Sequence, residues 1–128
     1  MDGLRKSTDI FVRATMKSVK PVVVYSDAEL TQEIENVEWQ MIAPGEVKTR
    51  TVYILSRSNI DINLSMTTKH WLPLVSADFI SLSWDKEGQV LSPKQSIEAV
   101  LTLTVSPDIQ DIAEFGFVIT ITGEEAVA

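Results

Sequence analysis

The chain has 128 residues, a net charge of −7 at pH 7 and no cysteine. This length suits one domain with a core of its own, and the lack of cysteine excludes disulfides and thiolate metal sites. The negative charge argues against binding to a nucleic acid backbone, and no stretch approaches the roughly 20 apolar residues of a membrane-spanning helix.

The N-terminal part predicts a flexible lead over residues 1–8 and a first strand over residues 9–17. The apolar residues that alternate along this strand are Ile10, Val12, Ala14 and Met16. A strand places all four on one face, because successive side chains point to opposite sides. A helix is the competing interpretation, since periodicity in so short a run is ambiguous. Pro21 ends the pattern, and the β-branched and aromatic residues 22–25 predict a second strand.

Two longer strands are expected in the middle of the chain, after a polar and acidic loop over residues 26–35. The third is indicated by Ile34, Val37, Trp39 and Met41. A Pro-Gly turn at residues 43–46 then leads into a fourth strand over residues 47–55. In that strand Val52 and Ile54 are expected to face inward, with Lys48 and Arg50 extending along the same row.

The remaining strands are predicted at residues 60–67, 79–84, 97–105 and 115–121, and Val90 and Leu91 lead to Ser92-Pro93 ahead of the long strand at 97–105. A longer connection with Trp71 and Pro73 covers residues 68–78, and one over residues 106–114 has room for one helical turn. The predicted core contains Val52, Ile54, Ile62, Leu64, Leu82, Leu101, Leu103, Phe117 and Ile119. Together these patterns favour an all-β, immunoglobulin-like antiparallel β-sandwich of about 7–9 strands, over residues 9–123 with a tail at 124–128.

Chemistry-bearing residues are sparse, so no catalytic, cofactor-binding or metal site is predicted. His70 is the only histidine, and no strand-turn-helix nucleophile motif accompanies it. Acidic residues at positions 27–38 match no calcium-binding loop and favour a solvated face. The three tryptophans are more typical of packing in a sandwich than of a carbohydrate platform.

Charge is distributed unevenly along the chain. Residues 1–20 hold five basic and two acidic residues, a net of +3, whereas the remainder holds six basic and sixteen acidic residues, a net of −10. A solvated surface and a basic lead that contacts an acidic surface both fit this pattern. Asp9, Arg13 and Lys17 interrupt any apolar run of a signal peptide, so we expect a cytoplasmic protein or a mature form of an exported one.

Several short motifs, in order, resemble a family of small archaeal exported or surface β-sandwich proteins and, more distantly, the camelysin-like proteins of biofilm fibres. The resemblance covers roughly residues 22–123. Its motifs are Val24-Tyr25-Ser26-Asp27, Val37-Glu38-Trp39, Pro44-Gly45-Glu46, Thr51-Val52-Tyr53-Ile54, Asn59 with Leu64-Ser65, Trp71-x-Pro73, Leu82-Ser83-Trp84-Asp85 and Leu101–Val105. The resemblance implies an extracellular or cell-surface location, no enzyme activity and no catalytic residue.

We therefore expect a non-enzymatic structural or interaction module that needs no cofactor. Its partner would be protein, chiefly further copies of itself, in a fibre or surface assembly built by β-strand addition. The candidate donated strand is the one that carries Ile10, Val12, Ala14 and Met16. The alternative is a monomeric accessory or ligand-binding domain.

Overall fold

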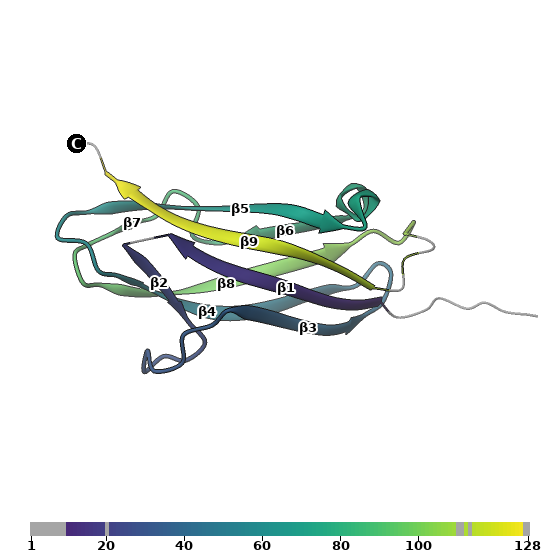
Figure 1. Ribbon diagram of the computed structural model, residues 1–128, viewed down its shortest axis with the longest axis horizontal. Helices are drawn as coiled ribbons and strands as arrows, with labels where there is room; N and C mark the ends of the chain where they lie inside the picture. The colour runs from purple at the N-terminus through teal and green to yellow at the C-terminus, as the bar shows by residue number, and fades with distance from the viewer. Residues whose placement is uncertain (1–9, 20, 110–111, 113, 127–128) are drawn as a thin grey trace, which may run out of the picture.

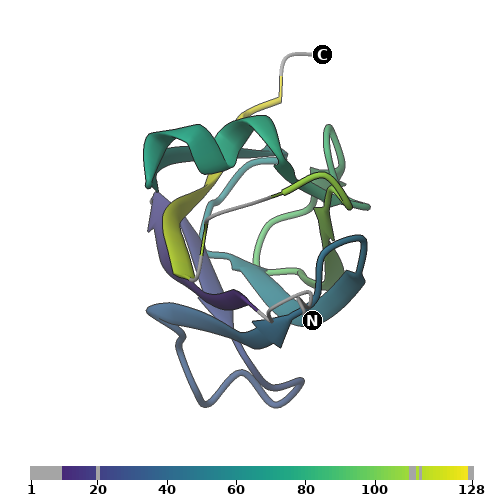
Figure 2. The same cartoon turned by 90° about the vertical axis from the view of Figure 1, so that its right-hand side faces the viewer.

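The computed structural model describes residues 10–19, 21–109, 112 and 114–126. Two β-sheets pack face to face, as the end-on view in Figure 2 shows. The five-stranded sheet has the order β3-β1-β9-β5-β7 and the four-stranded sheet the order β2-β4-β8-β6. The predicted all-β sandwich is thus confirmed.

Most strands are long and run along the long axis of the molecule (Figure 1). The five-stranded sheet contains β1 (Ile10–Val19), β3 (Asn36–Ile42), β5 (Ile62–Leu72), β7 (Val90–Leu91) and β9 (Glu114–Glu125). The four-stranded sheet contains β2 (Val22–Tyr25), β4 (Val47–Ser56), β6 (Ile80–Trp84) and β8 (Ser96–Val105). A short 3₁₀ helix, η1 (Leu74–Asp78), connects β5 to β6.

Period-two alternation builds the core between the two sheets. Along β8 the buried side chains from Ala99 to Val105 alternate with half-buried or exposed ones. Eight of the nine predicted core residues are buried, and only Leu82 is half-buried. Leu82 is more exposed because β6 lies at the edge of its sheet.

A β-bulge in β3 changes which side chains reach the core. Trp39 is fully buried as expected, but Met41 is 46% exposed and Ile42 is buried in its place. The register against β1 shifts here, and Gln40 adopts a left-handed conformation with φ 62°. The extra residue reverses the alternation, so Met41 lies within the predicted third strand but faces outward.

The fifth strand is longer than predicted. β5 continues through residues 68–72, which the sequence placed in a connection, and its register against β9 shifts between Lys69 and Leu72. His70, at this irregularity, has φ 58°.

In the connection after β8, Pro107 and Asp108 form a turn, and Ile109 after them is buried.

Strand pairing is antiparallel throughout the described residues except between β1 and β9, which run parallel. These two strands lie side by side in the middle of the five-stranded sheet (Figure 1).

In the part of the chain that the structure covers, no helix has the length and apolar character needed to span a membrane.

Candidate functional site

The predicted candidate for donation, the alternating face of β1, lies inside the chain's own sandwich. Its residues are Ile10, Val12, Ala14 and Met16, and none is more than 5% exposed. β1 is flanked by β3 on one side and by β9 on the other. The first strand therefore completes its own sheet here, and donation to a second copy requires its release.

β1 pairs with β9 and with β3, and neither pairing is a regular antiparallel one. Its pairing with β9 runs from Phe11 beside Glu114 to Val19 beside Thr122, and it is parallel. Parallel pairing is slightly less stable per residue than antiparallel pairing. On the other side, the bulge at Gln40 interrupts the pairing with β3. β1 thus lacks a regular antiparallel neighbour.

The connection from β1 to the rest of the fold is short. β1 ends at Val19 and β2 begins at Val22, yet the two strands belong to different sheets. Of the two residues between them, Pro21 has a φ angle that its ring fixes. This short connection therefore limits how far β1 can move from its own sandwich while β2 stays in place.

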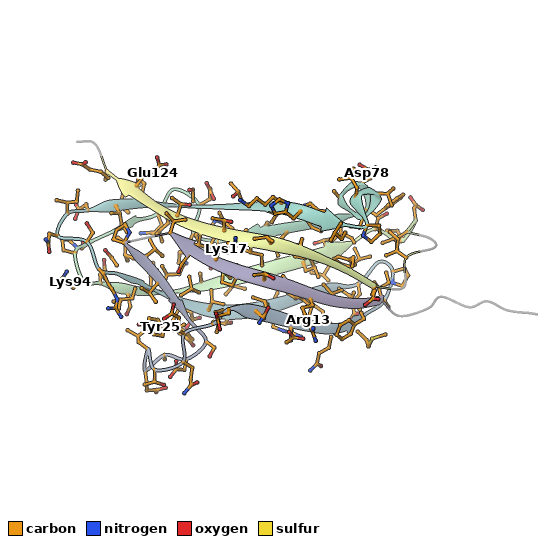
Figure 3. All side chains as sticks on the ribbon, viewed as in Figure 1. Arg13, Lys17, Tyr25, Asp78, Lys94 and Glu124 are labelled. Carbon is orange, nitrogen blue, oxygen red and sulfur yellow. The ribbon has the colours of Figure 1, made fainter. Side chains whose placement is uncertain are left out.

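The outward face of β1 is polar and charged. Arg13 forms an ion pair with Glu38 of β3, with 3.1 Å between Nε and Oε2, and its guanidinium lies 5.5 Å from the centre of the Phe11 ring. Arg13 and Lys17 are both exposed on this face, and Figure 3 labels them. An exposed ion pair of this kind adds little to stability, so the buried face provides most of what holds β1.

Side chains from β4 close the free edge of β3. Arg50 donates from Nε to the Glu38 carbonyl (3.1 Å) and from Nη2 to the Trp39 carbonyl (3.2 Å). Lys48 donates from Nζ to the carbonyls of Trp39 (3.2 Å) and Met41. Lys48 and Arg50 are the two cations that the sequence placed in the same row as Val52 and Ile54. They occupy the backbone acceptors that an added strand would need.

One backbone donor at the end of the same edge is occupied too. The backbone N–H of Ala43, just after β3, donates to the Glu46 carboxylate at 2.7 Å. Arg50 also lies 5.4 Å above the centre of the Trp39 ring. Cations on the carbonyls and a carboxylate on an N–H make β3 a poor template for a further strand.

The free edge of β2 is covered by the loop that follows it. Ile34 donates its N–H to the Val24 carbonyl at 3.1 Å, and Tyr25 forms an isolated antiparallel bridge with Glu33. Asp27 organises this loop: hydrogen bonds from the Thr31 hydroxyl and from nearby backbone N–H groups lower its pKa below the usual 3.8. This acidic loop therefore closes a sheet edge.

A shallow hollow of about 660 Å³ lies on the outer face of the five-stranded sheet. Its lining includes Phe11, Arg13, His70, Leu72, Glu114 and Gly116. Gly116 forms part of the floor because it carries no side chain; a Cβ there would lie 3.1 Å from the Arg13 carbonyl oxygen. Leu72, 71% exposed, stands at the rim.

His70 is exposed at the irregularity of β5, and none of the side-chain hydrogen bonds of the described residues involves it. No group of three or more His, Cys, Asp or Glu residues in the described part of the chain is arranged to hold a metal ion.

Two acidic residues in the turn after β6 accept hydrogen bonds from the backbone of other strands. Asp85 accepts from the Val100 N–H at 2.9 Å, and this bond, together with Lys86, lowers the pKa of Asp85 below 3.8. Glu87 accepts from the Met66 N–H at 3.1 Å and from the Trp84 indole at 2.7 Å. Both carboxylates accept hydrogen bonds from backbone N–H groups that lie just beyond the end of a strand pairing, β6 with β8 for Asp85 and β5 with β7 for Glu87.

The tryptophans do not form a shared platform. Trp39 is fully buried, whereas Trp71 stacks on Phe117 with ring centres 4.2 Å apart. Trp84 is half-buried, and its indole N–H donates a hydrogen bond to the Glu87 carboxylate. Each ring thus packs in its own surroundings.

No protein-family model matches the chain, and a search of curated proteins finds no match. The contacts of the strands themselves therefore carry the functional argument.

Proposed function

We propose that this protein is a non-enzymatic structural module that associates with further copies of itself by exchange of β1. The assembly is a fibre or a cell-surface layer, and its extracellular location follows from the sequence resemblance alone. The observation that carries the proposal is that β1 fills a slot between β3 and β9 with four buried side chains. A second copy of β1 has the same alternation and can fill the same slot.

The closed edges of β2 and β3 favour exchange over simple addition on this side of the sandwich. Lys48 and Arg50 occupy the acceptors of β3, and the loop with Ile34 covers β2. A strand arriving from another copy finds these backbone groups already bonded. The slot of β1 offers both neighbours and the core at once, and each released strand is replaced by an identical one, so exchange loses little energy.

The short connection between β1 and β2 constrains the shape of the assembly. The β1 strand of one copy can enter a second copy in the direction that it has in its own sheet, parallel to β9. The two sandwiches then meet at the ends where β1 finishes. Reciprocal exchange then closes a dimer. A strand that enters in the opposite direction keeps its alternating face and becomes antiparallel to β9, which places the bodies head to tail and lets a fibre grow.

A monomeric ligand-binding domain is the second candidate function. It is favoured by the hollow above Gly116, which combines the apolar side chains of Phe11 and Leu72 with the charges of Arg13 and Glu114. A few charged groups around an apolar floor are typical of small-molecule sites.

Light scattering and electron microscopy of the full chain over a concentration series test the proposal. We expect oligomers or filaments that an excess of a peptide spanning residues 9–19 converts to smaller species, because the peptide competes for the slot. A chain shortened by residues 1–19 should bind this peptide and fail to assemble.

The matched control is the same peptide with Val12→Lys and Ala14→Lys, which places two charges on the buried face and should not compete. A full chain that remains monomeric at every concentration contradicts self-assembly and leaves the ligand-binding function as the better account.

A further inference from the structure

β6, at the edge of the four-stranded sheet, differs from the closed edges of β2 and β3. It pairs with β8 on one side, and no other strand of the described residues pairs with its opposite side. Its sequence, Ile80 to Trp84, contains no charge, no proline and no glycine. Strands of this composition are the ones that accept a further strand.

The register determines which backbone groups of β6 are free. The Val105 N–H donates to Glu46, toward β4, so odd-numbered residues of β8 face β4 and even-numbered ones face β6. In the register of β6 against β8, Ser81 and Ser83 then bond to β8. The N–H and C=O groups of Ile80, Leu82 and Trp84 therefore point away from the sheet.

The neighbouring edge of β5 is less open. β7 pairs with Ile62 and Asn63, the Glu87 carboxylate takes the Met66 N–H, and Lys69 and an irregular register follow. A lysine and a bulge are common means of protecting an edge strand. Among the edges of the described residues, β6 offers the longest uncharged run without such protection.

We propose that β6 is a docking edge for β6 of a second copy, which joins the two four-stranded sheets around a two-fold axis. Antiparallel pairing centred on Leu82 places Leu82 opposite its counterpart and Ile80 opposite Trp84. Each such pair exchanges two backbone hydrogen bonds, because these three residues have outward-pointing groups.

Side chains and charges fit this arrangement. Ser81 lies opposite Ser83 of the second copy, and both are small and exposed. Leu82 and Trp84, half-buried at the border of the core, gain cover from the added strand. The charged residues that flank β6, which are Asp78 on one side (Figure 3) and the Asp85–Lys86 ion pair on the other, lie outside the paired stretch from Ile80 to Trp84.

This contact goes beyond the exchange of β1, because β6 lies in the other sheet and stays in its own chain. The two contacts can coexist, with β1 linking copies through one sheet and β6 through the other.

Sedimentation equilibrium of charge variants tests the docking edge. Ser81→Lys with Ser83→Lys places like charges directly opposite in the dimer and should weaken self-association by about tenfold or more. Ser81→Glu with Ser83→Glu should do the same. An equimolar mixture of the two variants should recover the association, because each lysine then faces a glutamate.

The matched control is Thr49→Lys with Thr51→Lys, which adds two exposed lysines to β4, a strand of the same sheet that β8 separates from β6. It should associate like the unchanged chain. The proposal is overturned if the β6 lysine variant associates as tightly as this control, or if the mixture does not recover association. Exchange of β1 does not bring residues 81 and 83 of two copies together, so this recovery reports on β6 alone.

Discussion

Arg50→Met removes the cation that closes the edge of β3 while it keeps an apolar side chain of similar length. The Arg50 guanidinium donates to the carbonyls of Glu38 (3.1 Å) and Trp39 (3.2 Å) and lies 5.4 Å from the centre of the Trp39 ring. We expect a lower free energy of unfolding, because both contacts join the two sheets.

The magnitude follows from these contacts. A hydrogen bond from a charged donor contributes about 1.5–3 kcal/mol when it is well buried. Arg50 is only half-buried, so water can replace part of each bond at the strand edge. Two bonds at about 0.5–1 kcal/mol each and a cation–π contact of about 0.5–1 kcal/mol give a loss of about 1.5–3 kcal/mol.

Urea unfolding followed by tryptophan fluorescence measures this loss. Lys17→Met is the control, since it removes one positive charge from an exposed position on β1 and should change stability by less than about 0.5 kcal/mol. If Arg50→Met proves as mild as Lys17→Met, the side-chain closure of β3 contributes nothing and the reasoning about closed edges is refuted.

Three further substitutions test other parts of the structure. Leu101→Ala, at a fully buried position, should cost about 2–5 kcal/mol in urea unfolding, whereas Leu72→Ala, 71% exposed, should cost little; equal losses would refute the assignment of faces. Gln40→Gly should raise the unfolding free energy by about 0.5–1 kcal/mol, because glycine tolerates the positive φ at the bulge; a loss would contradict this account of the bulge. The Val100 N–H lowers the pKa of Asp85 below 3.8, so its contribution is present above that pH and is lost as pH falls through the folded-state pKa. Asp85→Asn should therefore be less stable than the unchanged chain at pH 7, with a difference that shrinks in acid; a difference independent of pH would contradict the assigned bond.

Much of the fold could be predicted because the strands alternate so regularly. Period-two patterns identified the buried faces of β1, β4 and β8, including the inward row of Lys48 and Arg50. The bulge in β3 could not be read in the same way. Met41 and Ile42 are both apolar, so the sequence alone does not show that an extra residue turns the second of them inward.

Local sequence patterns could not predict which strands pair with each other. Nothing within residues 10–19 shows that β1 lies parallel to β9, because that contact joins opposite ends of the chain. The free carbonyls that Lys48 and Arg50 bind also become visible only when β3 and β4 are placed together. The hollow above Gly116 arises similarly from three strands, and among its lining residues only Gly116, a glycine inside a strand, is a signal for it in the sequence.

The most direct test of the account is to lock β1 in its own sheet with a disulfide. Thr15 and Val118 are neighbours in the β1–β9 register, and the chain has no other cysteine to interfere with a Thr15→Cys and Val118→Cys pair. Thr67→Cys with Thr120→Cys, which joins β5 to β9, is the control. Assembly of each oxidised variant is measured by light scattering with electron microscopy, before and after reduction. The account predicts that the β1 lock abolishes filaments until it is reduced, whereas the β5 lock leaves them unchanged. Filaments that form equally well from the oxidised β1-locked chain would contradict the exchange of β1.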